Sequence, residues 1–454
     1  MAATARAQRQ PQLLRAAVAA IVQQPELRQR LLFVFAMLVV FRFVSNLPVP
    51  GVDPAVLREI FQTNAVLGFL NLFSGGALRN MSVAAMGVYP YVTAAIVMQL
   101  MVPLVPTLRS LAQEGEYGRR QIEIYTHWLT VPMAFLQGYG QLILIQSLVP
   151  GSISVGFTGD TALRTLTILI TMTAGTMFLV WLGELITEKG IGNGISIIIF
   201  SGIVAGIPEY VGVGLFTGVG ATLVSTALLA AFTLGLVYLI VYFQEAQRRV
   251  PVQYSRSVFR GGRMYRQSGQ THIPLRVNSV GMIPLIFAYS MVLLPSYVGQ
   301  VLAQNNNDVI ATLGRWAQNV FTPGNPFYWI LLFVSVVLFT FFYTVVLFQQ
   351  QNLAENLQRQ GGFIPGIRPG RPTQEYINQV LMRITWAGAL FLGFVAVAPY
   401  LASLLFGTNL NLQGQSVAFG VTASGLIIVV GVVLDTMRQI EAQVLMRQYE
   451  GFIR

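Results

Sequence analysis

The chain contains no cysteine, two histidines and a single lysine among its 454 residues. The absence of cysteine excludes disulfide bonds and thiolate metal sites. His127 and His272 lie far apart in the sequence, which argues against a histidine-based metal or catalytic cluster. We therefore expect no metal site and no histidine-based catalytic cluster.

Charge is also scarce. Only 10% of the residues are charged, whereas soluble domains carry about 25%. Hydrophobic residues make up 54% of the chain, and the mean hydropathy is +0.62. A chain of this composition lacks the polar surface needed to cover a water-soluble fold. The composition therefore predicts a polytopic membrane protein.

Apolar stretches long enough to cross a bilayer recur along the chain. In hydrocarbon a helix satisfies its own backbone hydrogen bonds, so each stretch is predicted to be a helix. The sequence predicts an all-α protein with ten transmembrane helices, near residues 31–47, 81–105, 124–149, 163–187, 193–213, 222–243, 277–302, 327–349, 377–404 and 416–437. Because ten is even, both termini lie on the same side of the membrane.

The arrangement of the basic residues gives the orientation. The N-terminal tail, the C-terminal tail and the loops on their side hold 23 of the 28 basic residues, and the loops on the other side hold four. Basic residues concentrate on the cytoplasmic side of membrane proteins. The sequence thus predicts a cytoplasmic N-terminal tail, residues 1–30, and a cytoplasmic C-terminal tail, residues 438–454.

Ten spans can form two halves of five, 31–213 and 214–437, and two such halves would have opposite topology. Inverted halves are common in transport proteins and place a pathway at their interface. The spans contain few ionisable groups, Arg42 and Glu184 among them, which we interpret as snorkelling or locally paired side chains. An ion-coupled pump needs titratable groups near mid-membrane. An inverted-repeat secondary transporter of a small solute therefore remains only an alternative, as does an insertase, which would have a polar groove and fewer spans.

Two cytoplasmic loops, about 244–276 and 350–376, are longer than topology requires. The first alternates apolar and polar residues around Gly261-Gly262, which predicts a two-stranded hairpin. The glycines and prolines of the second exclude a long helix. Projecting arginines favour docking of a large anionic partner, either ribosomal RNA phosphates or an acidic protein face. The candidate docking residues are Arg248, Arg249, Arg256, Arg260, Arg263, Arg266, Arg368 and Arg371.

The stretch "AVLGFLNLFSGGALRNMSV" begins at Ala65 as an apolar helix and breaks at Ser74-Gly75-Gly76. Nine helical residues cover roughly 13 Å, less than half of a hydrocarbon core of roughly 30 Å. Non-helical backbone at that depth is tolerated only inside protein or beside a water-filled cavity. The sequence predicts a re-entrant half-helix that enters from the outer side.

Five strings in order carry a family resemblance. They are "LNLFSGGALRNMSVAAMGVYPYVTAAIVMQL", "GELITEKGIGNGISIIIFSGIVAGIP", "THIPLRVNSVGMIPLIFA", "GGFIPGIRPGRPT" and "LDTMRQIEAQVLMRQYEGF". From about residue 25 onwards the chain resembles the SecY family, the channel-forming subunits of the bacterial Sec translocon. The resemblance implies a clamshell of two inverted five-helix halves around an hourglass pore.

The same resemblance implies a passive protein-conducting channel in the cytoplasmic (inner) membrane, which is not an enzyme and has no catalytic residue and no cofactor. Such a channel translocates unfolded secretory polypeptides and releases transmembrane segments laterally into lipid, and SecA or the ribosome supplies the driving force. The implied partners are SecE, SecG, SecA, the ribosome, signal peptides, nascent polypeptides and membrane lipid.

The resemblance also assigns roles to residues. The implied pore ring consists of Val88, Val92, Ile195, Ile199, Ile286 and Ile428, with valine where the family usually has isoleucine at the first two positions. Branched aliphatic side chains can seal a pore by dewetting. A lateral gate would lie between the helices that carry Val92 and Ile286. The half-helix, about 65–76, would be the plug, with Leu67, Phe69, Leu70, Asn71, Phe73, Ser74, Gly75 and Gly76. Arg368 would matter for engagement of SecA.

Overall fold

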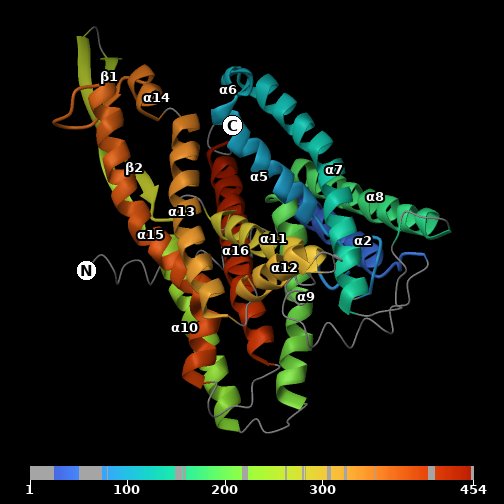
Figure 1. Cartoon of the computed structure of the whole chain (residues 1–454). Helices are drawn as coiled ribbons and strands as arrows, with labels where there is room; N and C mark the ends of the chain where they lie inside the picture. Colours follow the sequence, from blue (N-terminus) through green and yellow to red (C-terminus); the bar gives the residue numbers. More distant parts are fainter. Residues whose placement is uncertain are drawn as a thin grey trace. The chain divides into compact units, whose positions relative to one another are not determined.

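A computed structural model gives the fold of the chain (Figure 1). It describes residues 25–50, 74–78, 80–148, 156, 160–216, 223–260, 263–278, 281, 283–303, 308–321, 325–351, 353–406 and 415–450. The predicted half-helix, with Leu67, Phe69, Leu70, Asn71 and Phe73, lies outside the described residues. Ser74, Gly75 and Gly76 lie within them.

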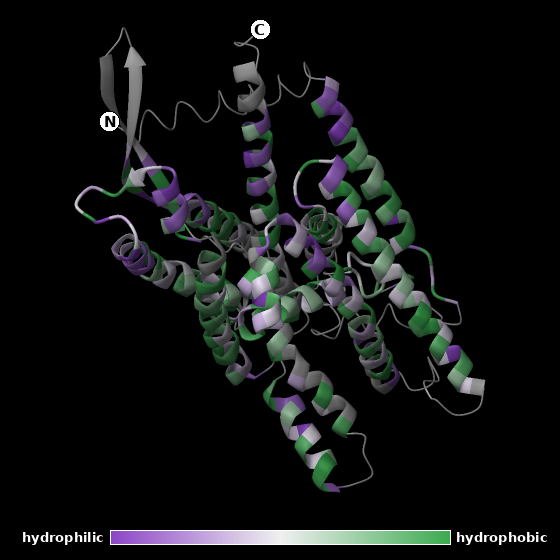
Figure 2. Ribbon diagram, turned by 90° about the horizontal axis from the view of Figure 1, so that it is seen from above, coloured by the Kyte–Doolittle hydropathy of each residue, from purple (hydrophilic) through white to green (hydrophobic). Residues whose placement is uncertain are grey.

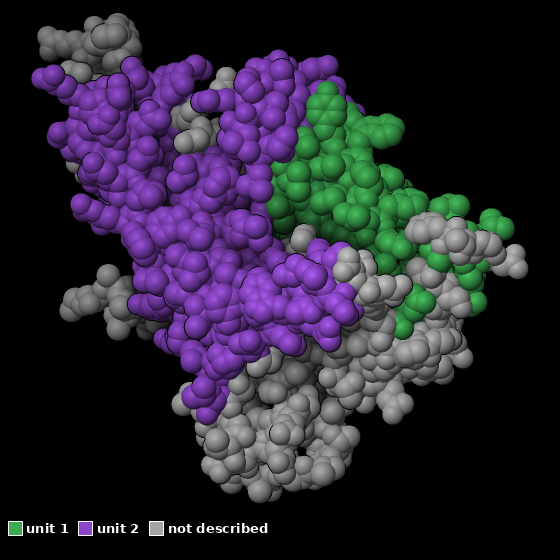
Figure 3. Space-filling model, viewed as in Figure 1, with its two compact units in different colours: residues 1–98, 123–221, 413–454 green, residues 99–122, 222–412 purple. Residues whose placement is uncertain are grey.

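The chain divides into two compact units, coloured in Figure 3. Unit 1 contains residues 1–98, 123–221 and 413–454, and unit 2 contains residues 99–122 and 222–412. Each unit is described by itself below. The division of the chain into inverted halves at 31–213 and 214–437 remains a prediction.

A helix occupies each of the ten predicted spans. These helices are α2 (Pro25–Ser45), α5 (Tyr89–Leu104), α7 (Glu116–Leu148), α8 (Asp160–Lys189), α9 (Gly194–Phe216), α10 (Leu223–Glu245), α11 (Ile283–Ala303), α13 (Pro326–Gln351), α15 (Arg371–Phe406) and α16 (Gln415–Glu450). Within the described residues, three helical stretches are long and apolar enough to cross a membrane, namely Thr161–Lys189, Pro326–Arg359 and Arg371–Ala398. A fourth candidate pairs α5 with α6 (Pro106–Gln113) across a 101° bend. Figure 2 shows apolar residues along much of the helices and hydrophilic residues gathered at many of their ends.

The helix in the predicted span 81–105 begins eight residues later than expected. The apolar run begins at residue 81, but α5 begins at Tyr89. Met81 and Gly87 have positive φ angles of 41° and 59°, which the α-helix does not allow. Pro90 then occupies the second position of α5, where its missing N–H is not needed.

Unit 1 is built around α8 and α9. The helix α9 packs against α8 and α16, and α2 packs against both α8 and α9. Glycines allow the closest of these approaches, because a Cβ at Gly183 of α8 would lie only 2.8 Å from the Cγ1 of Ile195. A small cluster of Leu27, Ile191 and Ile440 joins the start of α2 to the end of α16. The N-terminal, central and C-terminal segments of the unit thus share one core.

Unit 2 is a bundle in which α13 packs against α11 and α15, and α15 also packs against α10. Aromatic rings connect the helices. Phe243 of α10 stacks on Phe391 of α15 at a centroid distance of 3.9 Å, and Trp329 of α13 stacks on Tyr400 at 5.6 Å. The amphipathic helix α12 (Asp308–Val320), which the sequence analysis missed, packs against α11.

The predicted hairpin is confirmed. Strands β1 (Gln247–Arg260) and β2 (Arg263–Arg276) pair antiparallel, with Arg260 opposite Arg263, so the connection consists of residues 261–262 as expected. The second long loop contains the short helix α14 (Leu353–Arg359) and a two-residue strand, β3 (Gly362–Phe363), as well as irregular turns.

Strand β3 pairs with β1, opposite Gln253 and Tyr254, and makes a three-stranded sheet of order β2-β1-β3. The two long loops therefore form one body, which lies near one end of α13 and α15 in Figure 1. Its core is shared by the strands, α14 and α15, and it consists of Val250, Val252, Leu275, Leu357, Ile364, Ile377, Val380 and Leu381.

Candidate functional site

The segment that follows the predicted half-helix is irregular and buried. Ser74, Leu78 and Met81 each have at most 1% of their surface exposed. The backbone N–H of Leu78 donates to the Ser74 hydroxyl oxygen at 3.0 Å, and the N–H of Ser82 donates to the carbonyl of Ala77 at 2.9 Å. Local bonds and surrounding protein thus satisfy a backbone that is not helical, as a membrane environment requires.

Two short stretches of chain on either side of residues 51–73 lie against each other. The N–H of Val49 donates to the Met81 carbonyl at 2.8 Å, and the N–H of Val83 donates to the Leu47 carbonyl at 2.9 Å. The side chains of Asn46 and Asn80 are also hydrogen-bonded, at 3.2 Å. Residues 46–49 and 80–83 are therefore held together by backbone and side-chain hydrogen bonds.

Arg42 lies in the last turn of α2 and reaches the break at Gly75. Its Nη1 donates to the Gly75 carbonyl at 2.8 Å, and its Nη2 donates to the carbonyl of Ser201 on α9. The guanidinium is half-buried and lies 5.3 Å from the centre of the Phe41 ring. Arg42 is therefore paired, and its partners are backbone carbonyls of two other segments.

The predicted pore residues of unit 1 lie at the start of α5, in α9 and in α16. Val88 is buried just before α5, and its carbonyl accepts from the N–H of Val92, which is half-buried in the first turn. Ile199 on α9 is 4% exposed and Ile428 on α16 is fully buried. The helices α9 and α16 pack against each other.

Ile195 and Ile286 differ from the other members of the predicted ring. Ile195 is half-buried in the first turn of α9 and packs against Gly183 of α8, so part of its side chain serves helix packing. Ile286 lies in α11, which belongs to unit 2. The convergence of the six residues on one constriction stays a prediction.

The candidate docking arginines belong to unit 2. Arg248 and Arg249 begin β1 and are exposed, as are Arg368 and Arg371 around the start of α15. Arg371 makes a surface ion pair with Glu375 at 3.3 Å. The pairing of β3 with β1 places both groups on one body, which the sequence could not show.

The strand register divides the remaining arginines between two faces. Residues alternate along a strand, and directly opposed residues share a face. Arg256, Arg260 and Arg263 therefore lie on the same face as Arg248, whereas Arg249 and Arg266 lie on the other. Arg260 and Arg263 are directly opposed in the strand register.

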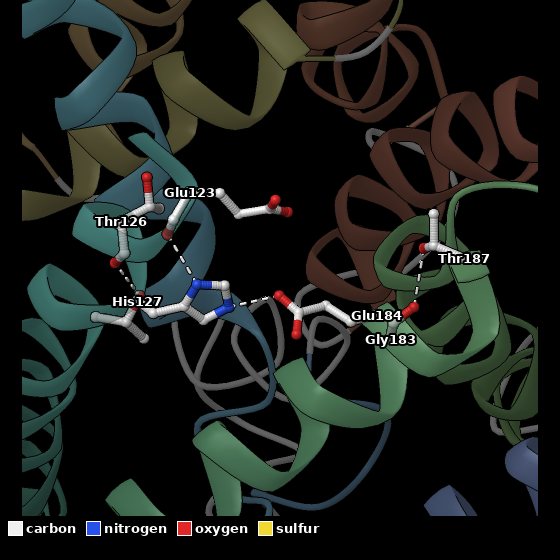
Figure 4. Close-up of polar contacts among 7 residues, drawn as sticks. Glu123, Thr126, His127, Gly183, Glu184 and Thr187 are labelled. Carbon is white, nitrogen blue, oxygen red and sulfur yellow. Dashed lines mark hydrogen bonds and ion pairs between the residues drawn. The ribbon is translucent and has the colours of Figure 1, made fainter. Parts of the chain in front are cut away.

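Unit 1 also contains an ionisable pair that the sequence analysis did not connect. His127 of α7 and Glu184 of α8 point toward one another in Figure 4, with Nε2 and Oε1 2.5 Å apart. Nδ1 of His127 lies 2.8 Å from the carbonyl of Glu123, and because a carbonyl only accepts, Nδ1 carries a hydrogen. The Tyr91 ring lies 5.6 Å from the imidazole. The sequence feature that could have indicated this pair is that both ionisable residues lie inside apolar stretches.

The fold is similar to those of solved protein-conducting channels. One such channel superimposes with a TM-score of 0.57 over 90% of this chain and 91% of that chain, at 16% identity. The Sec61 channel of a canine ribosome–channel complex from the endoplasmic reticulum gives 0.57 at 15% identity, with the same coverage. The chain therefore has the protein-conducting-channel fold, and the expected fold class is confirmed.

Sequence comparison narrows this class. The profile of the SecY family matches residues 82–437. A protein translocase subunit SecY from Streptomyces galbus is 40% identical over 448 residues, which covers 96% of this chain and 99% of the relative. The corresponding subunit of Vibrio cholerae is 38% identical and covers 94% of each chain. The chain belongs to the SecY family, as its motifs indicated.

Proposed function

We propose that the chain is the channel subunit of a protein translocase, through which unfolded secretory polypeptides cross the cytoplasmic membrane and from which transmembrane segments pass sideways into lipid. The observation that carries the proposal is the match to translocase SecY subunits over almost the whole of both chains. The similarity to protein-conducting channels in fold supports it independently. The family favours a channel over the alternative of a solute transporter.

The pore would be sealed by Val88, Val92, Ile195, Ile199, Ile286 and Ile428. Burial of Val88, Ile199 and Ile428 is consistent with a dry constriction. The lateral gate would lie between α5 and α11, and residues 65–76 would be the plug. A solved relative by fold is described as having a plug domain that stabilises the closed state and maintains a membrane seal; its TM-score is 0.56 at 18% identity.

The docking body, formed by β1, β2, β3 and the turns that end at Arg371, would face the cytoplasm and receive SecA or the ribosome. Its exposed arginines support this role, because exposed positive charge attracts RNA phosphates and acidic protein surfaces. Two channels of similar fold, canine Sec61 and yeast Ssh1, were solved bound to ribosomes. SecE and SecG would complete the complex, and both termini would be cytoplasmic.

Reconstitution tests the proposal. The complex purified from membranes is placed in vesicles with SecA and ATP, and a preprotein is added outside. Protection of the preprotein from added protease, dependent on both the channel and ATP, is the expected result. Vesicles that never protect a preprotein, while SecA still binds them, would contradict the proposal. Vesicles that contain only lipid provide the control.

A further inference from the structure

The helix α12 lies alongside the last turns of α11, and both helices belong to unit 2 (Figure 1). Ala311 and Gly314 form the packed face of α12 and are buried. A Cβ added at Gly299 of α11 would lie 2.8 Å from the Gly314 carbonyl oxygen and 2.9 Å from the Cβ of Ala317. One side of α12 is therefore fixed closely against α11.

Two other faces of α12 are exposed, and they differ in chemistry. Val309, Leu313 and Trp316 recur at helical spacing and are 68%, 60% and 60% exposed. We call these three residues the apolar stripe. A second exposed row, the polar stripe, consists of Asp308, Thr312, Arg315 and Asn319. With 3.6 residues per turn, the two stripes lie roughly 100° apart around the helix.

Neither water nor hydrocarbon alone suits both stripes. In water the apolar stripe would stay a cluster of large exposed hydrophobic side chains, which marks an interaction site. In hydrocarbon the charged Asp308 and Arg315 would be costly. At a boundary between lipid and water, an amphipathic helix lies with its apolar face toward the acyl chains, and both stripes are accommodated. Trp316 suits this depth, because tryptophan is enriched at membrane interfaces.

The surface beside α12 favours lipid as the occupant of the apolar stripe. The neighbouring turns of α11 expose Val298 and Leu302, at 47% and 36%, and α11 occupies one of the predicted spans. The apolar stripe thus adjoins apolar surface at the end of a span. Arg315 follows the same logic, because an arginine stem can lie along apolar surface while its guanidinium binds a lipid phosphate.

We propose that α12 is an interfacial helix whose apolar stripe binds the phospholipid surface at the C-terminal end of α11, with the polar stripe turned toward water. The packing of Gly299 on Gly314 transmits this contact and fixes the end of α11 relative to the bilayer surface. The inference requires the chain to lie in a membrane, but it does not depend on protein translocation.

Spin labelling tests the proposal, since the chain contains no cysteine of its own. Single cysteines are introduced along α12 and a nitroxide is attached to each. The purified complex is then placed in vesicles of phosphatidylethanolamine and phosphatidylglycerol, and the unsubstituted complex gives the background. Collision with oxygen reports exposure to lipid, and collision with a water-soluble nickel chelate reports exposure to water. The apolar stripe is probed by Val309→Cys, Leu313→Cys and Trp316→Cys, and the polar stripe by Thr312→Cys, Arg315→Cys and Asn319→Cys.

We expect oxygen collisions to exceed nickel collisions severalfold on the apolar stripe and the reverse on the polar stripe, so that the two signals alternate with the helical period. Leu338→Cys, at an exposed position in the middle of α13, gives the value for lipid. Gln360→Cys, at an exposed position after α14, gives the value for water.

Three results would overturn the proposal. Nickel access at both stripes would place α12 in water, and oxygen access alone at both would place it in hydrocarbon. Low access of both probes at the apolar stripe would show that a protein covers it. A complex that gives the expected pattern but exports no preprotein would contradict the proposed function alone.

A charge on the apolar stripe provides a second test. Leu313→Glu, combined with the label at Trp316→Cys, should raise nickel collisions severalfold, because a carboxylate is unfavourable in hydrocarbon and moves the helix toward water. Asn319→Glu with the same label is the matched control and should change them little. Equal effects of the two substitutions would overturn the role of the apolar stripe.

Discussion

At the scale of single residues, the pair of His127 and Glu184 joins two helices of unit 1 through one polar contact. Nδ1 of the imidazole donates to the Glu123 carbonyl, so Nε2 alone faces the carboxylate. The two side chains are therefore in direct polar contact, with Nε2 and Oε1 2.5 Å apart. The pair thus connects α7 to α8 (Figure 4).

Removing one partner of this pair leaves the other without compensation. We expect Glu184→Ala to destabilise the protein by about 1–2 kcal/mol, and Glu184→Gln by less, because an amide still accepts or donates. These values lie below those for fully buried pairs, since the side chains are 24% and 40% exposed. Thermal unfolding followed by tryptophan fluorescence measures the effect. Glu188→Ala, at an exposed site on the same helix, is the control; an equal loss there would contradict the role of the pair.

Ile428 provides a second residue-scale prediction. It is fully buried on α16, and Ile428→Asn would place an amide in an apolar site, which costs about 1–3 kcal/mol unless it is paired. If Ile428 seals the pore, the asparagine lets water enter the constriction, and the closed state becomes less stable. Export of a preprotein with a defective signal sequence should then rise about tenfold, since 1.4 kcal/mol is a factor of ten. Val433→Asn, on an exposed part of the same helix, should leave signal stringency unchanged. Unchanged stringency in Ile428→Asn would count against the ring.

At the scale of elements, the packing of α12 on α11 depends on a small side chain. A Cβ at Gly314 would lie 2.6 Å from the Gly299 carbonyl oxygen, and backbone cannot move aside cheaply. We expect Gly314→Ala to lower the unfolding free energy by about 1–3 kcal/mol, in the range of overpacked cores. Gly235→Ala in α10 is the matched control, because nothing lies within 4 Å of its added Cβ and helix propensity alone favours alanine by about 0.5–1 kcal/mol. Equal effects of the two substitutions in a denaturation assay would contradict this packing.

Some elements of the fold could be predicted from the sequence, and others could not. The positions of the long helices follow from apolar run length, and the hairpin follows from local alternation around Gly261-Gly262. Strand β3 has only two residues, and its partner lies in another loop, so no local pattern indicated it. The role of Arg42 was equally hidden, because its partners are backbone carbonyls, which every residue carries.

At the scale of the whole molecule, a net charge of +11 at pH 7 is concentrated on one predicted face. Pairing within the chain neutralises part of it, as in the Arg359–Glu355 pair at 2.6 Å and the Arg371–Glu375 pair at 3.3 Å. Exposed pairs of this kind contribute little to stability. The proposed anionic partner of the hairpin arginines is therefore tested by binding rather than by stability measurements.

Salt dependence of ribosome binding therefore reports on the hairpin. Each arginine that neutralises a phosphate adds roughly 0.7–0.9 to the slope of log affinity against log salt concentration. Glutamine at Arg256, Arg260, Arg263 and Arg266 together should reduce that slope by roughly three, if all four contact phosphate. Co-sedimentation of the purified complex with ribosomes at several salt concentrations measures the slope. Arg359→Gln, which removes an arginine already paired with Glu355, should change it by less than one contact. A slope that stays the same in the fourfold variant would exclude ribosomal RNA as the partner of the hairpin and would favour an acidic protein face.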